Sequence, residues 1–523
     1  MRPFLSDFLL LLWALTFILG VGLVLCHRFF GLRGLELIGF GSAVGIAVAG
    51  LLGLIAATVP ALRFVIVLAT IILTLAAVIY GSFSGLFREL YRALSKSARW
   101  SLGLWLAFNV FCLSIIRLNV VPPAQLPDGL FIFKTPQLNV KIQYMVGLPV
   151  DNYIPFVVSE YFIRGISFKQ EHPIIPGQEV SNRTILMSLA ALPFYVALAG
   201  SDNQPFSLRT FRYVGRDWPD VGKLNIGHRY EKFLVLGILL NSFLLLGLFV
   251  FASALEGGSD VLVPAFLLCA TNAYFITQTI FIWPKSLAAF FILLSWHGLR
   301  RGYSPMAVAC YAGLAYHAHP TGIIFAGGIA LFYLVSAPAN GMRWRNLLLF
   351  GLTVATLVLP WLLWTTFYLK LPSNLISQNL FNPKAPTDCL NFVWMRLKNL
   401  FDLFAPTMFG TFPFDLRRFI NGALFSLPGA VGLLLIIPAV VQLRQMRAER
   451  LFLWSCLILP ALAIVLIFSI QTIPAAHMPA VVGALVVFGV IRLRRHRLLC
   501  ALQLLGNLAV WKLFFLLWQE AAR

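Results

Sequence analysis

Long apolar runs dominate this sequence and set the first limit on its fold. Of its 523 residues, 60% are hydrophobic and only 11% are charged. A soluble chain of this length could not cover its surface with so few charged side chains, whereas helices in a bilayer expose apolar side chains to lipid. The sequence therefore predicts an all-α polytopic membrane protein.

The lengths of the apolar runs predict individual membrane spans. A helix rises about 1.5 Å per residue, so about 20 apolar residues cross the hydrocarbon core. About fourteen runs qualify as spans, although several are short and neighbouring ones could join. They cover residues 8–26, 36–58, 61–82, 101–119, 233–254, 262–282, 285–299, 304–318, 321–337, 347–369, 419–441, 451–470, 479–492 and 498–518.

Five groups of cations predict how these spans are oriented. Loops rich in Lys and Arg stay on the cytoplasmic side, and this rule explains the formal charge of +21 without nucleic acid. The groups are Arg88, Arg92, Lys96 and Arg99; Arg300 and Arg301; Arg343 and Arg345; Arg444, Arg447 and Arg450; and Arg492, Arg494, Arg495 and Arg497. Even numbers of spans separate the groups if residues 186–200 do not cross. We therefore expect 186–200 to form an amphipathic or re-entrant helix on the external surface.

This orientation leaves two long segments outside, residues 122–232 and 370–418. Short external turns fall near Pro60 and at residues 282–285, 316–320 and 471–479. The chain is expected to divide into an N-terminal three-span unit, residues 1–97, and a larger unit, residues 98–523. In the first unit, Gly41 and Gly45 form a GxxxG pair, which permits close helix packing.

The first external segment contains the best candidate for a catalytic carboxylate, Asp151 in LPVDNYIPF. An Asp in a loop is more often a turn or helix N-cap residue, and that alternative stays open. Residues 153–165 are then expected to form a short surface helix with Glu160 and Arg164 as polar members. Arg183 follows just before the next apolar run.

The external turns carry cations and histidines. Lys285, in IWPKS, either extends to the membrane interface beside Trp283 or faces a cavity and holds a phosphate. His317 and His319, in YHAHPTG, share a face on a strand but diverge on a helix, so a metal pair is one interpretation of this spacing. A histidine that bonds to backbone at a helix end is the more frequent case. His477 lies on the same external side.

In the second external segment, residues 390–404 have apolar positions at helical spacing with cations between them. This pattern predicts a surface helix on the bilayer, with Arg396 or Arg417 near a lipid phosphate. The seven cysteines show no paired spacing, so neither disulfides nor a zinc site is implied. No phosphate-binding glycine loop, HExxH or GxSxG occurs, and ATP-driven or hydrolase functions lack support.

The order of these parts resembles the GT-C superfamily of membrane glycosyltransferases, which use polyprenyl-phosphate sugars. The matching pieces are the span 101–119, LPVDNYIPF, NRTILMSLAAL, TIFIWPKSLAAFF and LAYHAHPTG. These sequence motifs are similar to those of bacterial members related to the ArnT and dolichyl-phosphate mannosyltransferase branches. The resemblance covers roughly residues 98–497. The resemblance implies a GT-C fold and an active site on the external face of the plasma membrane. It also implies a lipid-linked sugar donor and a lipid or glycan acceptor.

The resemblance further implies an inverting transfer with Asp151 as general base. The donor phosphate would be held by Lys285, Arg396, His317 and His319, and acceptor or supporting roles would fall to Glu160, Arg164, Arg183 and His477. The family often has paired acids where this chain has Asp151 and Asn152, so no cofactor is expected and a divalent metal is doubtful.

Three alternatives stay open, and a non-enzymatic assembly subunit is one of them. An O-antigen ligase or polymerase is also a lipid-linked glycan enzyme, but such enzymes tend to rely on arginine and histidine in a late loop. A transporter or flippase would place ionisable residues near mid-bilayer, and here they stand near span ends, as Arg63 and Arg117 do.

Overall fold

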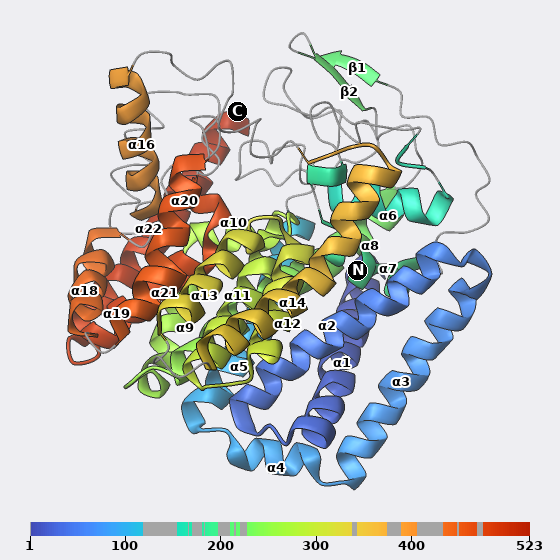
Figure 1. Ribbon diagram of the computed structural model, residues 1–523, viewed down its shortest axis with the longest axis horizontal. Helices are drawn as coiled ribbons and strands as arrows, with labels where there is room; N and C mark the ends of the chain where they lie inside the picture. The colour runs from blue at the N-terminus through green and yellow to red at the C-terminus, as the bar shows by residue number, and fades with distance from the viewer. Residues whose placement is uncertain are drawn as a thin grey trace.

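The computed structural model of the chain is built almost entirely of helices (Figure 1). It describes residues 2–118, 154–165, 167–169, 180–182, 184–196, 210–213, 216–219, 227–336, 342–373, 389–404, 432–446, 449–467 and 474–522. Asp151, Arg183 and Arg417 lie outside the described residues.

The elements follow one another along the chain as a series of helices with one small sheet. The α-helices are α1 (Arg2–Phe30), α2 (Gly34–Thr58), α3 (Arg63–Phe83), α4 (Leu86–Ala93), α5 (Lys96–Leu118), α6 (Ile154–Arg164), α7 (Leu186–Tyr195), α8 (Gly227–Ser253), α9 (Leu262–Ala270), α10 (Ala273–Ile280), α11 (Lys285–Arg300), α12 (Pro305–Ala318), α13 (Gly322–Ser336), α14 (Met342–Leu363), α16 (Cys389–Phe404), α18 (Gly432–Gln445), α19 (Arg450–Phe452), α20 (Leu459–Ile467), α21 (Pro479–Leu493) and α22 (Arg497–Ala522). The shorter helical turns are η1 (Pro60–Leu62), η4 (Val180–Asn182), η7 (Ser259–Val261), η8 (Trp364–Tyr368), η10 (Leu453–Ile458) and η11 (Pro474–His477). Strands β1 (Thr210–Tyr213) and β2 (Arg216–Pro219) pair antiparallel, so the prediction of an all-α chain holds apart from this ribbon.

Within the described ranges, six helices are long and apolar enough to cross a bilayer, which supports the prediction of a membrane protein. They are Leu5–Phe30, Gly34–Thr58, Pro60–Phe83, Lys232–Ser253, Trp344–Tyr368 and Arg450–Ile467. A further candidate, Ser259–Ala270 with Tyr274–Ile280, is bent by 72° at its break. Several other predicted spans are helices of 14–16 residues, namely α11, α12, α13 and α21, so the count of about fourteen stays a prediction.

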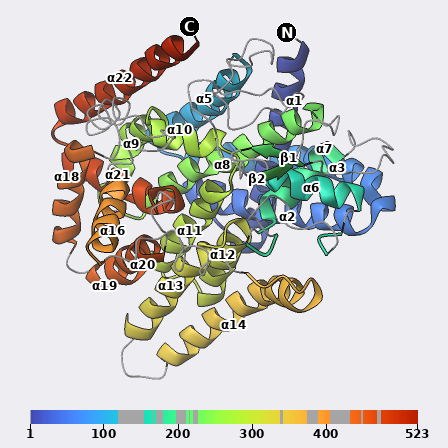
Figure 2. The same ribbon diagram turned by 90° about the horizontal axis from the view of Figure 1, so that it is seen from above.

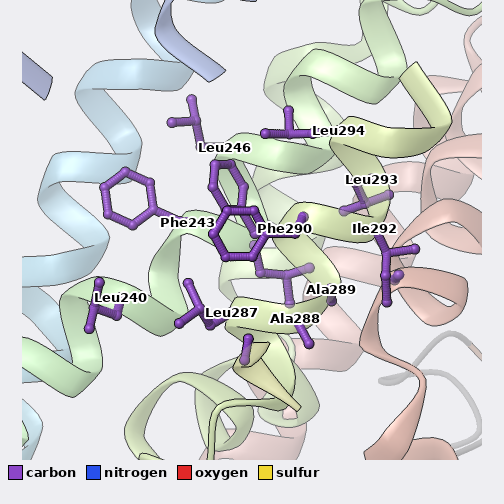
Figure 3. Packing of buried hydrophobic residues seen from close by; sticks show 14 of the residues in the cluster. Leu240, Phe243, Leu246, Leu287, Ala288, Ala289, Phe290, Ile292, Leu293 and Leu294 are labelled. Atoms are coloured by element: carbon purple, nitrogen blue, oxygen red, sulfur yellow. The ribbon is translucent and has the colours of Figure 1, made fainter. Parts of the chain in front are cut away.

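The core of the bundle is the packing of α8 against α11. The most apolar window of α8 is 100% buried inside the protein. Figure 3 shows Phe243 and Leu246 of α8 beside Phe290 and Leu294 of α11. Gly247 lets this contact close up, since a methyl group there would stand 3.0 Å from the Phe290 ring. Around this pair, α3, α14 and α22 lie at the periphery of the bundle (Figure 2).

The predicted GxxxG pair does bring two helices together. A Cβ added at Gly45 would lie 1.9 Å from the carbonyl oxygen of Ile18, and Gly41 faces the backbone of Gly22. Helices α1 and α2 therefore pack backbone to backbone, which only glycine permits. The domain boundary at residues 97 and 98 stays a prediction, and α2 also contacts α7, α8 and α11 of the larger unit.

Of the two alternatives predicted for residues 186–200, the amphipathic surface helix is wrong, and the re-entrant helix stays a prediction. Every residue of α7 is buried, and α7 packs against α2 so closely that a Cβ at Gly53 would stand 1.9 Å from the Leu189 carbonyl oxygen. The sequence LMSLAALPFY is apolar on all sides, which suits a buried helix and not an interfacial one. Its ten residues span about 15 Å, too short to cross a bilayer.

The two other predicted surface helices differ from each other. The predicted helix at 153–165 is present as α6, but it belongs to the bundle. All eight residues from Ile154 to Tyr161 are buried, Glu160 included. The predicted helix at 390–404 is present as α16, and it exposes apolar side chains. Leu390 is 77% exposed and Trp394 66%, as expected for a helix whose outer face meets lipid.

Basic groups from distant parts of the chain meet at one end of the bundle. Arg300, in the last turn of α11, forms an ion pair with Glu449, which borders another basic group. Arg494 lies against Gly257 in the turn after α8. This end is opposite to Lys285, the first residue of α11. Three of the five basic groups therefore lie at or beside this end of the bundle, and its location on the cytoplasmic side stays a prediction.

The α1–α2 contact predicts the effect of a single methyl group. We expect Gly45→Ala to destabilise the protein by about 1–3 kcal/mol, because the added Cβ overlaps the Ile18 carbonyl. The measurement is the apparent unfolding temperature in detergent. Gly351→Ala, in α14, is the matched control because nothing lies within 4 Å of its added Cβ, and it should be neutral or slightly stabilising. Equal unfolding temperatures for the two variants would contradict the packing argument.

Candidate functional site

Three predicted site residues from distant turns converge in the structure. Lys285 begins α11, His319 caps the C-terminal end of α12, and His477 ends η11. The Lys285 Nζ lies 3.3 Å from the His477 Nε2, and the two imidazole rings lie 5.7 Å apart. Lys285, His319 and His477 are 3%, 1% and 4% exposed, so the cluster is sheltered from solvent. We call these three residues the KHH cluster.

Trp283 forms one wall of the KHH cluster. The Lys285 Nζ lies 3.6 Å from the indole centroid, and the rings of His319 and His477 lie 5.9 and 5.8 Å from it. A buried ammonium group over an indole face gains cation–π stabilisation. Of the two options that the sequence left for Lys285, the structure therefore favours the inward one: the side chain is buried in the bundle beside Trp283.

Hydrogen bonds determine where the histidine protons lie. The backbone N–H of Thr321 donates to His319 Nδ1 at 3.3 Å, and the Thr321 hydroxyl lies 2.8 Å from the same atom. Nδ1 is therefore an acceptor, which puts the proton of a neutral His319 on Nε2. The Lys285 ammonium can only donate, so it makes His477 Nε2 an acceptor and puts that proton on Nδ1. The KHH cluster thus combines an ammonium group with two imidazole N–H groups.

Three helices begin at the KHH cluster. Lys285 is the first residue of α11, α13 begins three residues after His319 at Gly322, and α21 begins two residues after His477 at Pro479. The N-terminal end of a helix carries partial positive charge, and a lysine in the first turn is unfavourable unless an anion is near. Side chains and helix ends together make this a place of positive potential that suits a phosphate or carboxylate.

Two predicted phosphate ligands point elsewhere. His317 lies in the last turn of α12, and its Nε2 bonds to the Leu357 carbonyl oxygen of α14 at 2.8 Å. Arg396 donates to the Val465 carbonyl at 3.2 Å and lies over the Phe392 ring. Partial burial lowers the pKa of the Arg396 guanidinium. Helix α16, which carries it, does contact η11 and is therefore a neighbour of the KHH cluster.

Glu160 and Arg164 belong to a separate buried ion-pair network. Glu160 is 0% exposed and accepts two hydrogen bonds from Arg229, at 3.1 Å from Nε and 2.8 Å from Nη2. Arg164 adds a third bond at 3.2 Å. This geometry fastens α6 to the start of α8, so these residues support the fold at this point.

Sequence reasoning missed several partners in the structure. The sequence analysis names neither Arg229, which binds Glu160, nor Thr321, which orients His319, as a site residue. Asp7 of α1 also went unnoticed, although it pairs with Lys232 of α8 at 2.7 Å. A single acid within an apolar run is a usable signal, because a charge in the membrane normally has a partner. Among the described residues, no group of three or more His, Cys, Asp and Glu is arranged to hold a metal ion.

Comparisons with known proteins add no relative to this geometry. No model of a protein family matches the chain, and neither the curated proteins nor the solved structures give a match. The function is therefore inferred from the sequence and from the contacts described above.

The Glu160 network predicts unequal effects for its two arginines. We expect Arg229→Gln to destabilise the protein by about 3–5 kcal/mol, because it leaves a buried carboxylate without its two-bond partner. Arg164→Gln removes one longer hydrogen bond at a more exposed position, so it should lower the free energy of unfolding by less. Unfolding in detergent monitored by circular dichroism compares the two. A larger loss for Arg164→Gln would contradict this account.

Proposed function

We propose that the chain is an inverting glycosyltransferase of the GT-C class. It transfers a sugar from a polyprenyl-phosphate donor to an acceptor hydroxyl of a lipid or glycan, at the external face of the plasma membrane. The observation that carries the proposal is the convergence of Lys285, His319 and His477 at the N-terminal ends of three helices. A site of this kind stabilises negative charge.

The chemistry of the donor matches such a site. When the bond between the anomeric carbon and the phosphate oxygen breaks, the phosphate leaves with its bonding electron pair and gains negative charge. It is already a weak base, so it needs nearby positive charge and N–H donors and no general acid. The acceptor hydroxyl attacks the anomeric carbon from the opposite side, which inverts its configuration, and a base takes the hydroxyl proton.

The residue roles follow from the contacts and from the family resemblance. Lys285, His319 and His477 hold the donor phosphate, which assigns His477 to phosphate binding in place of His317 and Arg396. Asp151 is the general base, and this role rests on the resemblance and on its place in the sequence. Glu160 acts through the buried network that anchors α6.

The proposed orientation places the KHH cluster outside. Because Lys and Arg accumulate in cytoplasmic loops, the end of α11 that bears Arg300 is cytoplasmic and the end that bears Lys285 is external. Helix α16, with Trp394 exposed and with contacts to η11, lies where a donor in the outer leaflet approaches. About fourteen spans and a GT-C fold are part of this proposal.

A transporter or flippase is the second candidate, and the bent pair α9–α10 favours it. Substrate sites in transporters are often built from helices interrupted inside the membrane. An O-antigen ligase or polymerase is a further alternative with the same kind of lipid-linked substrate. The test of Asp151 separates a transferase from a transporter.

We expect Asp151→Asn to abolish turnover while donor binding is kept. Purified protein is incubated with a panel of polyprenyl-phosphate sugars, and the rate of sugar transfer is measured with the donor that the native chain uses. Removing the base should lower the rate by about 100-fold or more, with donor affinity within about threefold because the ammonium and imidazole groups remain. Undiminished sugar transfer by the Asp151→Asn variant would rule out Asp151 as the base. If the protein is a transporter, the substitution should leave its transport activity unaffected.

We expect Lys285→Met to weaken phosphate binding by about 10- to 100-fold, the effect of losing one charged hydrogen bond. The probe is a short-chain polyprenyl phosphate, titrated into protein in lipid nanodiscs by calorimetry. His317→Gln is the control, because its described bond goes to the Leu357 carbonyl, and it should bind within about threefold of the native protein. Equal losses in both variants would contradict the assignment of the phosphate to the KHH cluster.

A further inference from the structure

The backbone that leads into Lys285 is not helical although it lies inside the bundle. Between the end of α10 and the start of α11, Phe281 and Ile282 are 1% and 0% exposed. A backbone carbonyl that leaves a helix in such surroundings must find another donor, since an unpaired one costs free energy. How these carbonyls are satisfied therefore decides where the segment lies.

Asn241 of α8 supplies those donors. Its Nδ2 lies 3.0 Å from the Phe281 carbonyl oxygen, 3.4 Å from that of Trp283 and 3.5 Å from that of Thr279. The side chain is 0% exposed. The amide orientation follows from these contacts, because exchanging its two ends would put an oxygen against three carbonyl oxygens.

A second contact on the same helix restricts the segment further. Gly237, one turn before Asn241, leaves room for Ile282, whose Cγ2 would stand 2.5 Å from a Cβ at that position. Helix α8 therefore receives the Ile282 side chain and binds the carbonyl on either side of it. The Trp283 carbonyl in turn accepts the Lys285 backbone N–H at 2.8 Å, so the constraint extends to the first residue of α11.

We propose that Asn241 is the positioning residue of the KHH cluster. It does not contact the substrate; it holds the backbone that places the Trp283 indole under the Lys285 ammonium group and the ammonium group beside His477. That the position of Lys285 serves phosphate binding rests on the proposed function. That Asn241 fixes the position of Lys285 rests on the contacts alone.

Loss of the Asn241 donors is expected to change the structure only in the segment between α10 and α11. The helices on both sides of the segment are held by their own packing, so the non-helical residues are the part most able to rearrange. Moving them lets the freed carbonyls find water or other donors, and Lys285 moves with them. The ammonium group then becomes more accessible, even where the bundle as a whole stays folded.

The test compares two buried asparagines. Asn241→Leu keeps a similar volume and removes the N–H donors, and Asn241→Ser keeps one donor on a shorter side chain. Asn109→Leu and Asn109→Ser are the matched controls, because Asn109 is 2% exposed and donates only to the Trp105 carbonyl of its own helix. Competitive acylation followed by mass spectrometry measures the reactivity of Lys285 in the full chain, without any ligand. Transfer kinetics are measured in parallel.

We expect Asn241→Leu to raise the acylation rate of Lys285 about tenfold, as a buried hydrogen bond is lost. Asn241→Ser should give a smaller rise, and it keeps the test valid if the Leu variant does not fold. The Asn109 variants should match the native rate. In the kinetics, KM for the donor should rise in the same order across the Asn241 variants.

Unchanged Lys285 reactivity in folded Asn241 variants overturns the proposal, whatever happens to activity, and so does an equal rise in the Asn109 variants. If the native chain transfers no sugar but Lys285 reactivity responds to Asn241, the proposed function fails and the positioning role stands. The two failures are therefore distinguishable.

Discussion

Inside an apolar bundle, every interruption of a helix frees backbone groups that must find hydrogen-bond partners in the protein. This chain meets the requirement with side-chain amides. Asn241 serves the segment before α11, and Asn507 of α22 donates at 2.9 Å to the Leu268 carbonyl, beside the bend between α9 and α10. Asn272 accepts the Tyr274 N–H at the start of α10. The segment before α11 and the bend between α9 and α10 are thus held by side chains of α8 and α22, which are distant in the sequence.

Charges near the ends of the bundle follow a similar rule, since each of the buried acids described here has a basic partner on another helix. Asp7 pairs with Lys232, and Glu160 with Arg229. At the basic end, Glu36 of α2 lies 2.9 Å from His297 Nε2 on α11. Two of these pairs tie the first two helices to α8 and α11, so these helices contribute to the same core as the rest of the bundle. Breaking such a pair is costly because it leaves a buried charge.

Helices were predictable from the sequence because apolar length and spacing depend on local composition. Whether a helix is buried was harder to predict, because α7 and α16 are both rich in apolar residues and differ in what surrounds them. That Lys285, His319 and His477 lie at the same end of the bundle could be expected, because counting the spans between them puts their turns on one side of the membrane. The separation of His317 from His319 could not, because it depends on where α12 ends. His317 lies in its last turn, whereas His319 has extended backbone with φ −151° and ψ 138°. Asn241 and Arg229 could not be predicted as partners because each is far in sequence from the residue that it binds, Phe281 and Glu160 respectively.

The converging helix ends also bear on which ligand the site selects. A metal ion needs carboxylate, thiolate or unprotonated imidazole ligands, and each added cation opposes it. At the KHH cluster, a lysine ammonium already occupies the lone pair of His477 Nε2, and Thr321 occupies that of His319 Nδ1. In these tautomers the other nitrogen of each ring carries an N–H, and the N-terminal ends of α11, α13 and α21 add partial positive charge. Under the proposed function, the same protons that would oppose a metal ion at this cluster would bind the donor phosphate, so its selectivity would follow from the tautomers that Lys285 and Thr321 impose.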